Sequence, residues 1–276
     1  MRLLKILLII VLVLVTLAYG ATEVYERIHP RNEAPVISCE STTLELSVKD
    51  DLHQALLAGV TAMDAQEGDM TAAIRISGIS KFIDDATVNV NYVVFDSDHN
   101  VGSLTRTVRF TDYESPRFSL SGPLSYKASE DILLVDRLHA IDCLDGDITD
   151  SIRTTPMEAG DTSELYFITV QAVNSMDDTS TLCLPVILRY DDLRRPEVVL
   201  TDYLVYLEQG SSFNSRSYIS HVSTEAGLVG KTDVKVEGSV DTGKPGTYYI
   251  HYTYTYTDAD TNVESTGRSV LTVVVE

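Results

Sequence analysis

The sequence predicts an all-β protein: three tandem antiparallel β-sandwiches that follow an N-terminal hydrophobic helix. Three observations predict this class, namely an apolar N-terminal run, a repeat of about 80 residues, and the alternation of apolar with other residues inside each repeat. A chain of 276 residues with 44% hydrophobic composition is long enough for two or three packed cores, and its composition is not that of a disordered chain.

The N-terminus carries the features of an export signal. Arg2 and Lys5 precede an uncharged apolar run, Ile6–Tyr19, whose 14 residues suit a signal peptide better than the roughly 20 residues of a typical spanning helix. Ala18–Gly20 is an acceptable cleavage site, but two leucines before Lys5 extend the run and no second apolar span follows. Residues 1–20 are therefore interpreted as a signal peptide or a signal-anchor helix. The uncleaved anchor is favoured, with its basic end inside, and both alternatives place the domains outside the cytoplasm.

Prolines mark the repeat. Pro35, Pro116 and Pro196 recur at near-equal intervals, and each opens a strand-like segment, where a proline fixes the direction of the chain and removes one hydrogen-bond donor. With residues 21–34 as a linker, the predicted domains are residues 35–112, 113–191 and 192–276.

Internal alignments support these boundaries. Residues Thr61–Thr71 align without gaps on His139–Thr149, and both segments carry a D-x-x-[DE]-G-D-x-T motif. The third repeat lacks this motif, but Val234–Gly238 aligns with Ile74–Gly78. The first and second repeats are thus related through the acidic motif, and the first and third through the segment that follows it.

Each repeat reads as a series of short strands. Apolar or aromatic residues alternate with others in Leu44–Val48, Val88–Val94 and Tyr248–Tyr254, the period of half-buried strands. Turn residues such as Asp145-Gly146 separate the runs. Three small sandwiches in tandem predict an elongated rod with short, proline-marked joints.

These residues resemble a known family. The segment Gly59–Thr71, together with Lys244–Tyr252 in the last repeat, is similar to the bacterial immunoglobulin-like (Ig-like) repeats of surface proteins. The second repeat departs from the pattern with Arg137 and Leu138 where the first has Gly59 and Val60. The resemblance implies Ig-like β-sandwich modules that serve as stalks, spacers or adhesive domains, without one biochemical activity.

Charge and cysteine content exclude several functions. With 21 basic and 41 acidic residues, the formal charge of -20 is the opposite of a surface that neutralises phosphates, so nucleic acid is not an expected partner. Cys39, Cys143 and Cys183 form no closely spaced pair that would indicate a zinc or redox centre. A Cys143–Cys183 disulfide is an open alternative, and buried free thiols are favoured.

The acidic motif is the sharpest local feature, and it has two interpretations. The carboxylates are hard oxygen donors that could bind calcium in one loop. Alternatively, they accept hydrogen bonds from turn amides while the glycine adopts a positive φ, and the sequence favours this reading because the spacing does not match an EF-hand. The calcium candidates are Asp64, Glu67 and Asp69 in the first repeat and Asp142, Asp145 and Asp147 in the second. No other cofactor is expected.

A tyrosine-rich strand in the last repeat offers a ligand candidate. Alternation assigns Tyr248, Tyr252 and Tyr254 to the core, which leaves Tyr249 and His251 facing outward as a possible aromatic platform for a sugar. A solvated sheet face is the simpler interpretation.

The sequence contains no recognisable catalytic constellation, and the pairing of His139 with Cys143 lacks an orienting third group. We therefore predict a non-enzymatic, extracytoplasmic structural or adhesive protein that is either anchored in the membrane by its N-terminal helix or secreted. Its expected partner is an extracellular protein or glycan. The alternative function is a carbohydrate-binding accessory module of the cell envelope.

Overall fold

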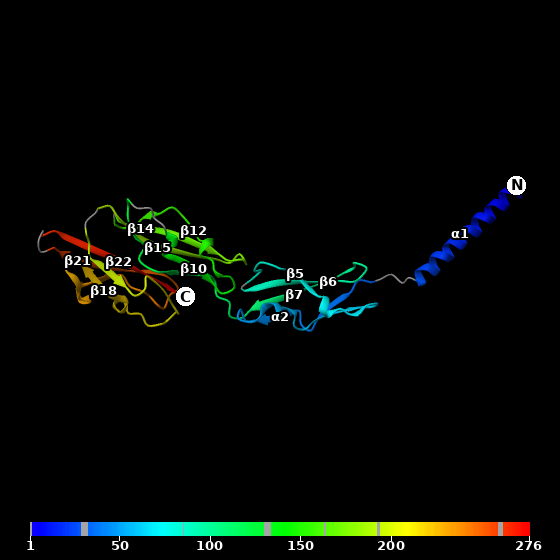
Figure 1. Ribbon diagram of the computed structural model, residues 1–276, viewed down its shortest axis with the longest axis horizontal. Coiled ribbons are helices and arrows are strands. Elements are labelled where there is room, and N and C mark those ends of the chain that lie inside the picture. The colour runs from blue at the N-terminus through cyan, green and yellow to red at the C-terminus, as the bar shows by residue number, and fades with distance from the viewer. Residues whose placement is uncertain are drawn as a thin grey trace. The chain divides into compact units, whose positions relative to one another are not determined.

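The computed structural model describes residues 2–28, 33–84, 86–129, 134–162, 164–191, 194–258 and 262–276. The chain divides into two compact units, Met1–Thr111 and Asp112–Glu276, and each is described by itself (Figure 1). After the first helix, the regular structure consists of β-strands with short helical turns between them. The predicted all-β class with an N-terminal helix is confirmed.

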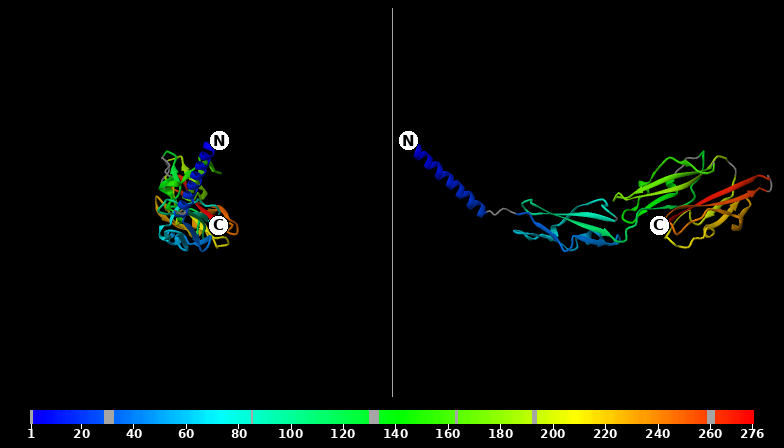
Figure 2. Two further views of the ribbon diagram at one scale, coloured as in Figure 1. Left: turned by 90° about the vertical axis from the view of Figure 1, so that its right-hand side faces the viewer. Right: turned by 180° about the vertical axis from the view of Figure 1, so that it is seen from behind.

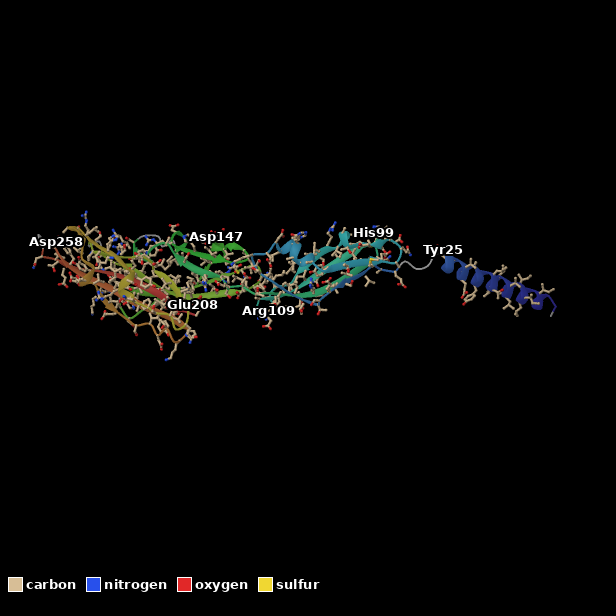
Figure 3. All side chains as sticks on the ribbon, turned by 90° about the horizontal axis from the view of Figure 1, so that it is seen from below. Tyr25, His99, Arg109, Asp147, Glu208 and Asp258 are labelled. Carbon is tan, nitrogen blue, oxygen red and sulfur yellow. The ribbon has the colours of Figure 1, made fainter. Side chains whose placement is uncertain are left out.

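The N-terminal helix α1 spans Arg2–Ile28, well beyond the apolar run seen in the sequence. Its segment Leu8–Tyr25 has a mean hydropathy of 2.0, and none of it is buried against the rest of the protein. Twenty-seven residues at 1.5 Å each give a length of about 40 Å, enough to cross the hydrocarbon core of a bilayer. The side chains of α1, with Tyr25 labelled, stand out from the helix in Figure 3.

The first unit continues with one β-sandwich of two sheets, whose strand orders are β1-β3-β4 and β2-β7-β6-β5. Inward-facing residues such as Val90, Tyr92 and Val108 form its core and are fully buried. Its elements are β1 (Val36–Cys39), β2 (Thr43–Leu46), α2 (Leu52–Leu57), β3 (Val60–Asp64), β4 (Gly68–Asp69), η1 (Thr71–Ala73), β5 (Arg75–Ile79), β6 (Thr87–Phe95) and β7 (Val101–Phe110).

The second unit contains two more sandwiches with the same order of strands. The earlier one has sheets β11-β10-β8 and β12-β14-β15-β9, with β13 beside β14. Its elements are β8 (Arg117–Leu120), β9 (Ser125–Lys127), η2 (Leu134–Asp136), β10 (Leu138–Asp142), β11 (Gly146–Asp147), η3 (Thr149–Ser151), β12 (Arg153–Thr154), β13 (Glu158–Ala159), β14 (Leu165–Val173) and β15 (Thr179–Arg189).

The last sandwich has sheets β16-β18-β19 and β17-β22-β21-β20. In all three sandwiches the second strand pairs in parallel with the last one, which makes the topology a threefold repeat. The elements are β16 (Glu197–Leu200), β17 (Leu204–Leu207), η4 (Ser215–Tyr218), β18 (Ile219–Thr224), β19 (Gly227–Val229), η5 (Lys231–Asp233), β20 (Lys235–Glu237), β21 (Gly246–Thr257) and β22 (Glu264–Val275).

A close backbone contact explains why the last strand of the first and third repeats carries a glycine opposite the opening proline. A Cβ atom on Gly102 of β7 would lie 2.1 Å from the carbonyl oxygen of Pro35, and one on Gly267 of β22 would lie 1.9 Å from that of Pro196. Only glycine allows the strand to pass this close to the proline carbonyl. In the second repeat Ser180 occupies the corresponding position, as its pairing with Ala172 shows.

The second and third repeats do not follow each other as a rod with short joints. The outer faces of β14–β15 and β21–β22 pack against each other, so that these four strands run side by side (Figures 1 and 2). Consequently β15 is buried on both faces, with Leu184 and Val186 in its own core and Pro185 and Ile187 on the outside. The prediction of a rod is wrong for this pair of repeats. The alternation of residues shows which face of a sheet lies in the core, but it does not show that the outer face packs against another domain.

Candidate functional site

The acidic turns of the first and second repeats have the same hydrogen-bonded build. Asp64 Oδ1 accepts from the amides of Gln66 and Glu67 at 2.7 and 2.8 Å. Asp142 Oδ1 does the same for the amides of Leu144 and Asp145, both at 2.9 Å. Each Asp therefore accepts hydrogen bonds from the amides of its own turn, which is the structural role that the sequence favours over calcium binding.

The remaining acidic residues of the motif are also engaged. Asp69 and Asp147 each accept from the amide of the threonine two residues on, at 2.9 Å. Hydrogen bonding with the side chain of that threonine, and then with its amide, lowers the pKa of both carboxyls from the ordinary value of 3.8. Glu67 Oε1 accepts from the amide of Ser97 at 2.6 Å, and Asp145 accepts from the amide and hydroxyl of Ser175. Figure 3 labels Asp147.

Among the described residues, no group of three or more His, Cys, Asp and Glu side chains is placed to hold a metal ion. The observed contacts account for the motif without a cation, and calcium at these turns stays a prediction.

The third repeat replaces this turn by a shorter one. Thr224 pairs with Gly227, whereas Asp64 pairs with Gly68, so the connection is one residue shorter. The Thr224 hydroxyl donates to the carbonyl of Gly227 at 3.0 Å. A local turn of different length thus explains why the acidic motif is missing from the third repeat.

Tyr249 and His251 face away from the core of the third repeat, toward the second repeat. The Tyr249 ring packs on Phe167 with centroids 5.2 Å apart, and its hydroxyl donates to the carbonyl of Cys183 at 2.9 Å. Burial lowers the pKa of the half-buried His251 imidazole, although Glu237 and Asp161 act in the opposite direction. Tyr249 is therefore part of a domain interface and does not present its ring as an open platform.

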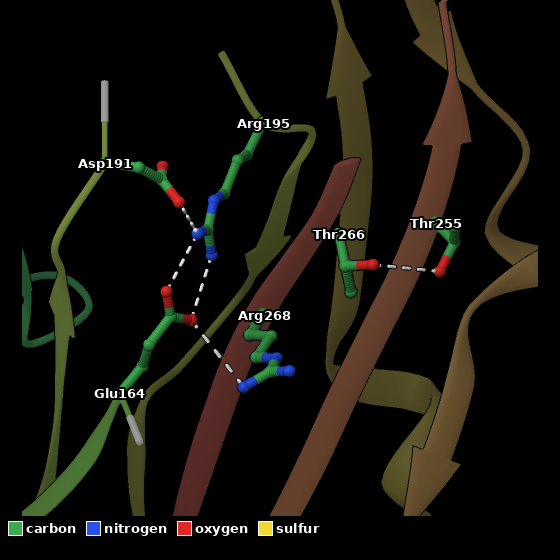
Figure 4. A network of polar contacts seen from close by, with 6 residues as sticks. All are labelled: Glu164, Asp191, Arg195, Thr255, Thr266 and Arg268. Carbon is green, nitrogen blue, oxygen red and sulfur yellow. Dashed lines mark hydrogen bonds and ion pairs between the residues drawn. The ribbon is translucent and has the colours of Figure 1, made fainter. Parts of the chain in front are cut away.

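Four charged side chains fasten the edge of this interface (Figure 4). Glu164, from the turn before β14, accepts from both terminal nitrogens of Arg195, at 2.9 and 2.8 Å, in a bidentate pair whose side chains are each only 14% exposed. Asp191 pairs with the same guanidinium at 2.6 Å, and Arg268 of β22 approaches Glu164 to 3.7 Å. The hydrogen bonds with Glu164 raise the pKa of Arg195, which stays charged.

A cavity of about 290 Å³ lies between the two repeats beside this network. Glu164, Leu165 and Ile187 line it from the second repeat, and His251 and Arg268 line it from the third. Its volume is near the lower end of small-molecule sites. His251 was the only one of these residues predicted from the sequence, because the others become neighbours only when two domains pack together.

The three cysteines are free. Cys39 and Cys183 are half-buried, but Cys143, in the turn after β10, is exposed and its thiol donates to the carbonyl of Glu114 at 3.2 Å. The expectation of buried thiols is therefore wrong for Cys143, because its turn lies at the surface. Although the Cys143 residue is exposed, partial desolvation of its sulfur raises the pKa of the thiol.

Comparison with known proteins identifies the last repeat. Residues 199–272 match the family model described as "Bacterial surface protein, Ig-like domain". The last repeat is therefore similar to the Ig-like domains of bacterial surface proteins. The predicted resemblance to bacterial Ig-like repeats is thus confirmed, while the acidic motif lies outside the matched residues. No curated protein matches the chain.

Several solved structures match the chain at low identity and low TM-score. Over 87% of its length the chain is similar to 30% of a Clostridium perfringens ZmpB chain with the M60 catalytic domain, CBM51-1 and CBM51-2, at 11% identity and a TM-score of 0.23. It is similar to 42% of a second ZmpB chain, with CBM51-2 in complex with GlcNAc and INT domains, at 13% identity and a TM-score of 0.24. The chain therefore spans less than half of either ZmpB chain. Human CDH23 EC21-23 is matched over its whole length at 11% identity and a TM-score of 0.21.

Proposed function

We propose that this protein is a non-enzymatic surface protein, held in the membrane by α1, whose Ig-like repeats act outside the cytoplasm as a stalk or protein-interaction module. One observation carries the proposal: an apolar helix with no buried residue in Leu8–Tyr25 precedes the Ig-like sandwiches. An apolar helix of this length with no protein surface against it is stable in a bilayer and is costly in water. The match of the last repeat to a bacterial surface family supports the same location.

The domain limits complete the proposal. We propose repeats at residues 35–112, 113–191 and 192–276, since the three sets of strands with identical topology fall within these limits. The first repeat would act as a separate module, and the second and third as one body joined through their sheets. A body of two packed domains is stiffer than two domains on a flexible joint, which suits a stalk.

The carbohydrate-binding alternative is less well supported. It depended on Tyr249 as an outward aromatic platform, and this ring is packed on Phe167 instead. We therefore propose a protein partner ahead of a glycan for the stalk or adhesive role.

Thiol labelling of intact cells tests the location. Cys143 is exposed, so a membrane-impermeant maleimide should label the full-length chain in intact cells, and the labelled chain should sediment with the membrane fraction. The matched control Cys143→Ser should lose most of the label, since the other two cysteines are half-buried.

Two outcomes would contradict the proposal. Labelling that appears only after lysis would place the repeats inside the cell. Labelled protein in the medium, with the mass of a chain that starts at Ala21, would show that the leader is cleaved and would exclude the membrane anchor.

A further inference from the structure

A second cleft between the repeats of the second unit differs from its surroundings in charge. Its volume is about 340 Å³, and its walls come from β9 and β15 of the second repeat and from β16 and β22 of the third. Four arginines and one acidic residue line it: Arg137, Arg189, Arg195, Arg268 and Glu197. The chain as a whole has about twice as many acidic as basic residues, so this concentration of arginine is unusual for the molecule.

None of these arginines is inherited from the repeat pattern. According to the strand pairings, the position of Arg189 is occupied by Thr111 in the first repeat and by Glu276 in the third. The position of Arg268 is occupied by Ser103 in the first repeat and by Thr181 in the second. By the same pairings Arg137 replaces Gly59 of the first repeat and Tyr218 of the third. Arg195 precedes the opening proline, where the other repeats have Ala34 and Ser115. The same fold forms twice without arginine at these positions, so the fold itself does not require them.

The arginines of the cleft are only partly used by the protein itself. Within the described residues Arg189 Nε makes no hydrogen bond, and because this atom is buried, the terminal nitrogens of Arg189 are the donors for a ligand. Arg137 uses one terminal nitrogen, which donates to the carbonyls of Pro123 and Ser125, and its guanidinium lies 5.0 Å from the ring centre of Tyr126. Among the residues that the structure describes, the Arg268 side chain has one ionic contact, the 3.7 Å approach to Glu164. Guanidinium groups fixed in this way are suited to oxyanions because they present parallel N–H donors.

We propose that this cleft binds an oxyanion, the phosphate or carboxylate group of a ligand, between Arg137, Arg189 and Arg268. The anion brings the second and third repeats together at the edge of their interface, since Arg137 and Arg189 belong to one and Arg268 to the other. A free anion and an anionic group on a polymer of the cell envelope share this chemistry. An anion that holds the arginines also compensates the repulsion between their charges.

Calorimetric titration of the full chain in detergent, at low ionic strength, tests the site. The probes are inorganic phosphate, glucuronate and a poly(glycerol phosphate) chain. Arg189→Gln should weaken binding by roughly tenfold, because a charge-assisted hydrogen bond is lost. Arg153→Gln is the matched control: it removes the same charge from the exposed strand β12 of the second repeat and should leave affinity unchanged. Binding should weaken as salt is added.

Arg268→Gln provides an independent arm, because this arginine belongs to the third repeat and Arg189 to the second. It should also weaken binding by roughly tenfold. Poly(glycerol phosphate) binding tighter per site than phosphate would identify a polymer as the source. Absence of binding for all three probes, or equal affinities of the Arg189→Gln and Arg153→Gln variants, would overturn the proposal.

Discussion

The hydroxyl of Tyr249 in the third repeat donates a hydrogen bond to the backbone carbonyl of Cys183 in the second, at 2.9 Å. The Tyr249 ring also packs on Phe167, and burial raises the pKa of the Tyr249 hydroxyl, which stays protonated as a donor. This pair links two repeats that the sequence alone would leave as separate modules. It joins them through the outer faces of their sheets.

The first prediction concerns this tyrosine. Tyr249→Phe should destabilise the second unit by about 1 kcal/mol, because the Cys183 carbonyl loses its hydrogen bond, and Tyr249→Ala by about 2 kcal/mol or more, because the ring contact is also lost. Urea unfolding measures both. Tyr256→Phe, on the same strand, is the control and should have no effect. A Tyr249→Ala variant as stable as the original chain would contradict the interface.

The second prediction concerns Glu164. Glu164→Gln removes the charge that Arg195 and Arg268 share, and the 14% exposure of the Glu164 side chain means that water cannot fully replace it. We expect a loss of about 2 kcal/mol in unfolding free energy of the second unit. Glu237→Gln breaks the exposed pair with Lys235 and is the control, for which no measurable change is expected. Equal stability of the two variants would show that the Glu164 network is merely a surface feature.

The third prediction uses a difference between the first two repeats. In the second repeat the Asn174 amide donates to Asp142 Oδ2 at 3.1 Å. In the first repeat Asp96 occupies the position of Asn174, and Asp64 Oδ2 is buried without a hydrogen bond in the described part of the chain. Asp96→Asn should therefore supply the missing donor and stabilise the first unit by about 1 kcal/mol in thermal unfolding at neutral pH.

The converse variant is the control for that exchange. Asn174→Asp should destabilise the second unit, because it places a second carboxylate against Asp142, and the loss should shrink as the pH falls and one carboxyl becomes protonated. Destabilisation of the first unit by Asp96→Asn would show that its bond with the Asn100 amide, at 2.7 Å, outweighs the new donor.

The sequence predicted what local patterns determine. The alternation of residues identified the strands and the buried Tyr252. The segments Ile74–Gly78 and Val234–Gly238, aligned from the sequence, both follow a 3₁₀ turn, so they are equivalent in the structure. The packing of two repeats was missed, although β15 carried a signal for it. Its unbroken apolar run Leu182–Leu188 is typical of a strand buried on both faces, whereas β7 has polar residues on its outer face. The arginine cleft could not be predicted, because its residues are far apart in the chain and meet only across the domain interface.

The last prediction tests calcium at the acidic turns. Asp64 and Asp142 already hold two turn amides each, and Asp69 and Asp147 hold one, so we expect the turns to keep their structure without a cation. The thermal midpoints of both units should be the same in EDTA and in millimolar calcium. Calcium binding at the turns would instead raise the midpoints of both units, since a ligand that binds only the folded state stabilises it. Hydrogen exchange at the short Thr224–Gly227 turn of the third repeat is the internal control, and a calcium-dependent change there would show a non-specific effect of the acidic surface.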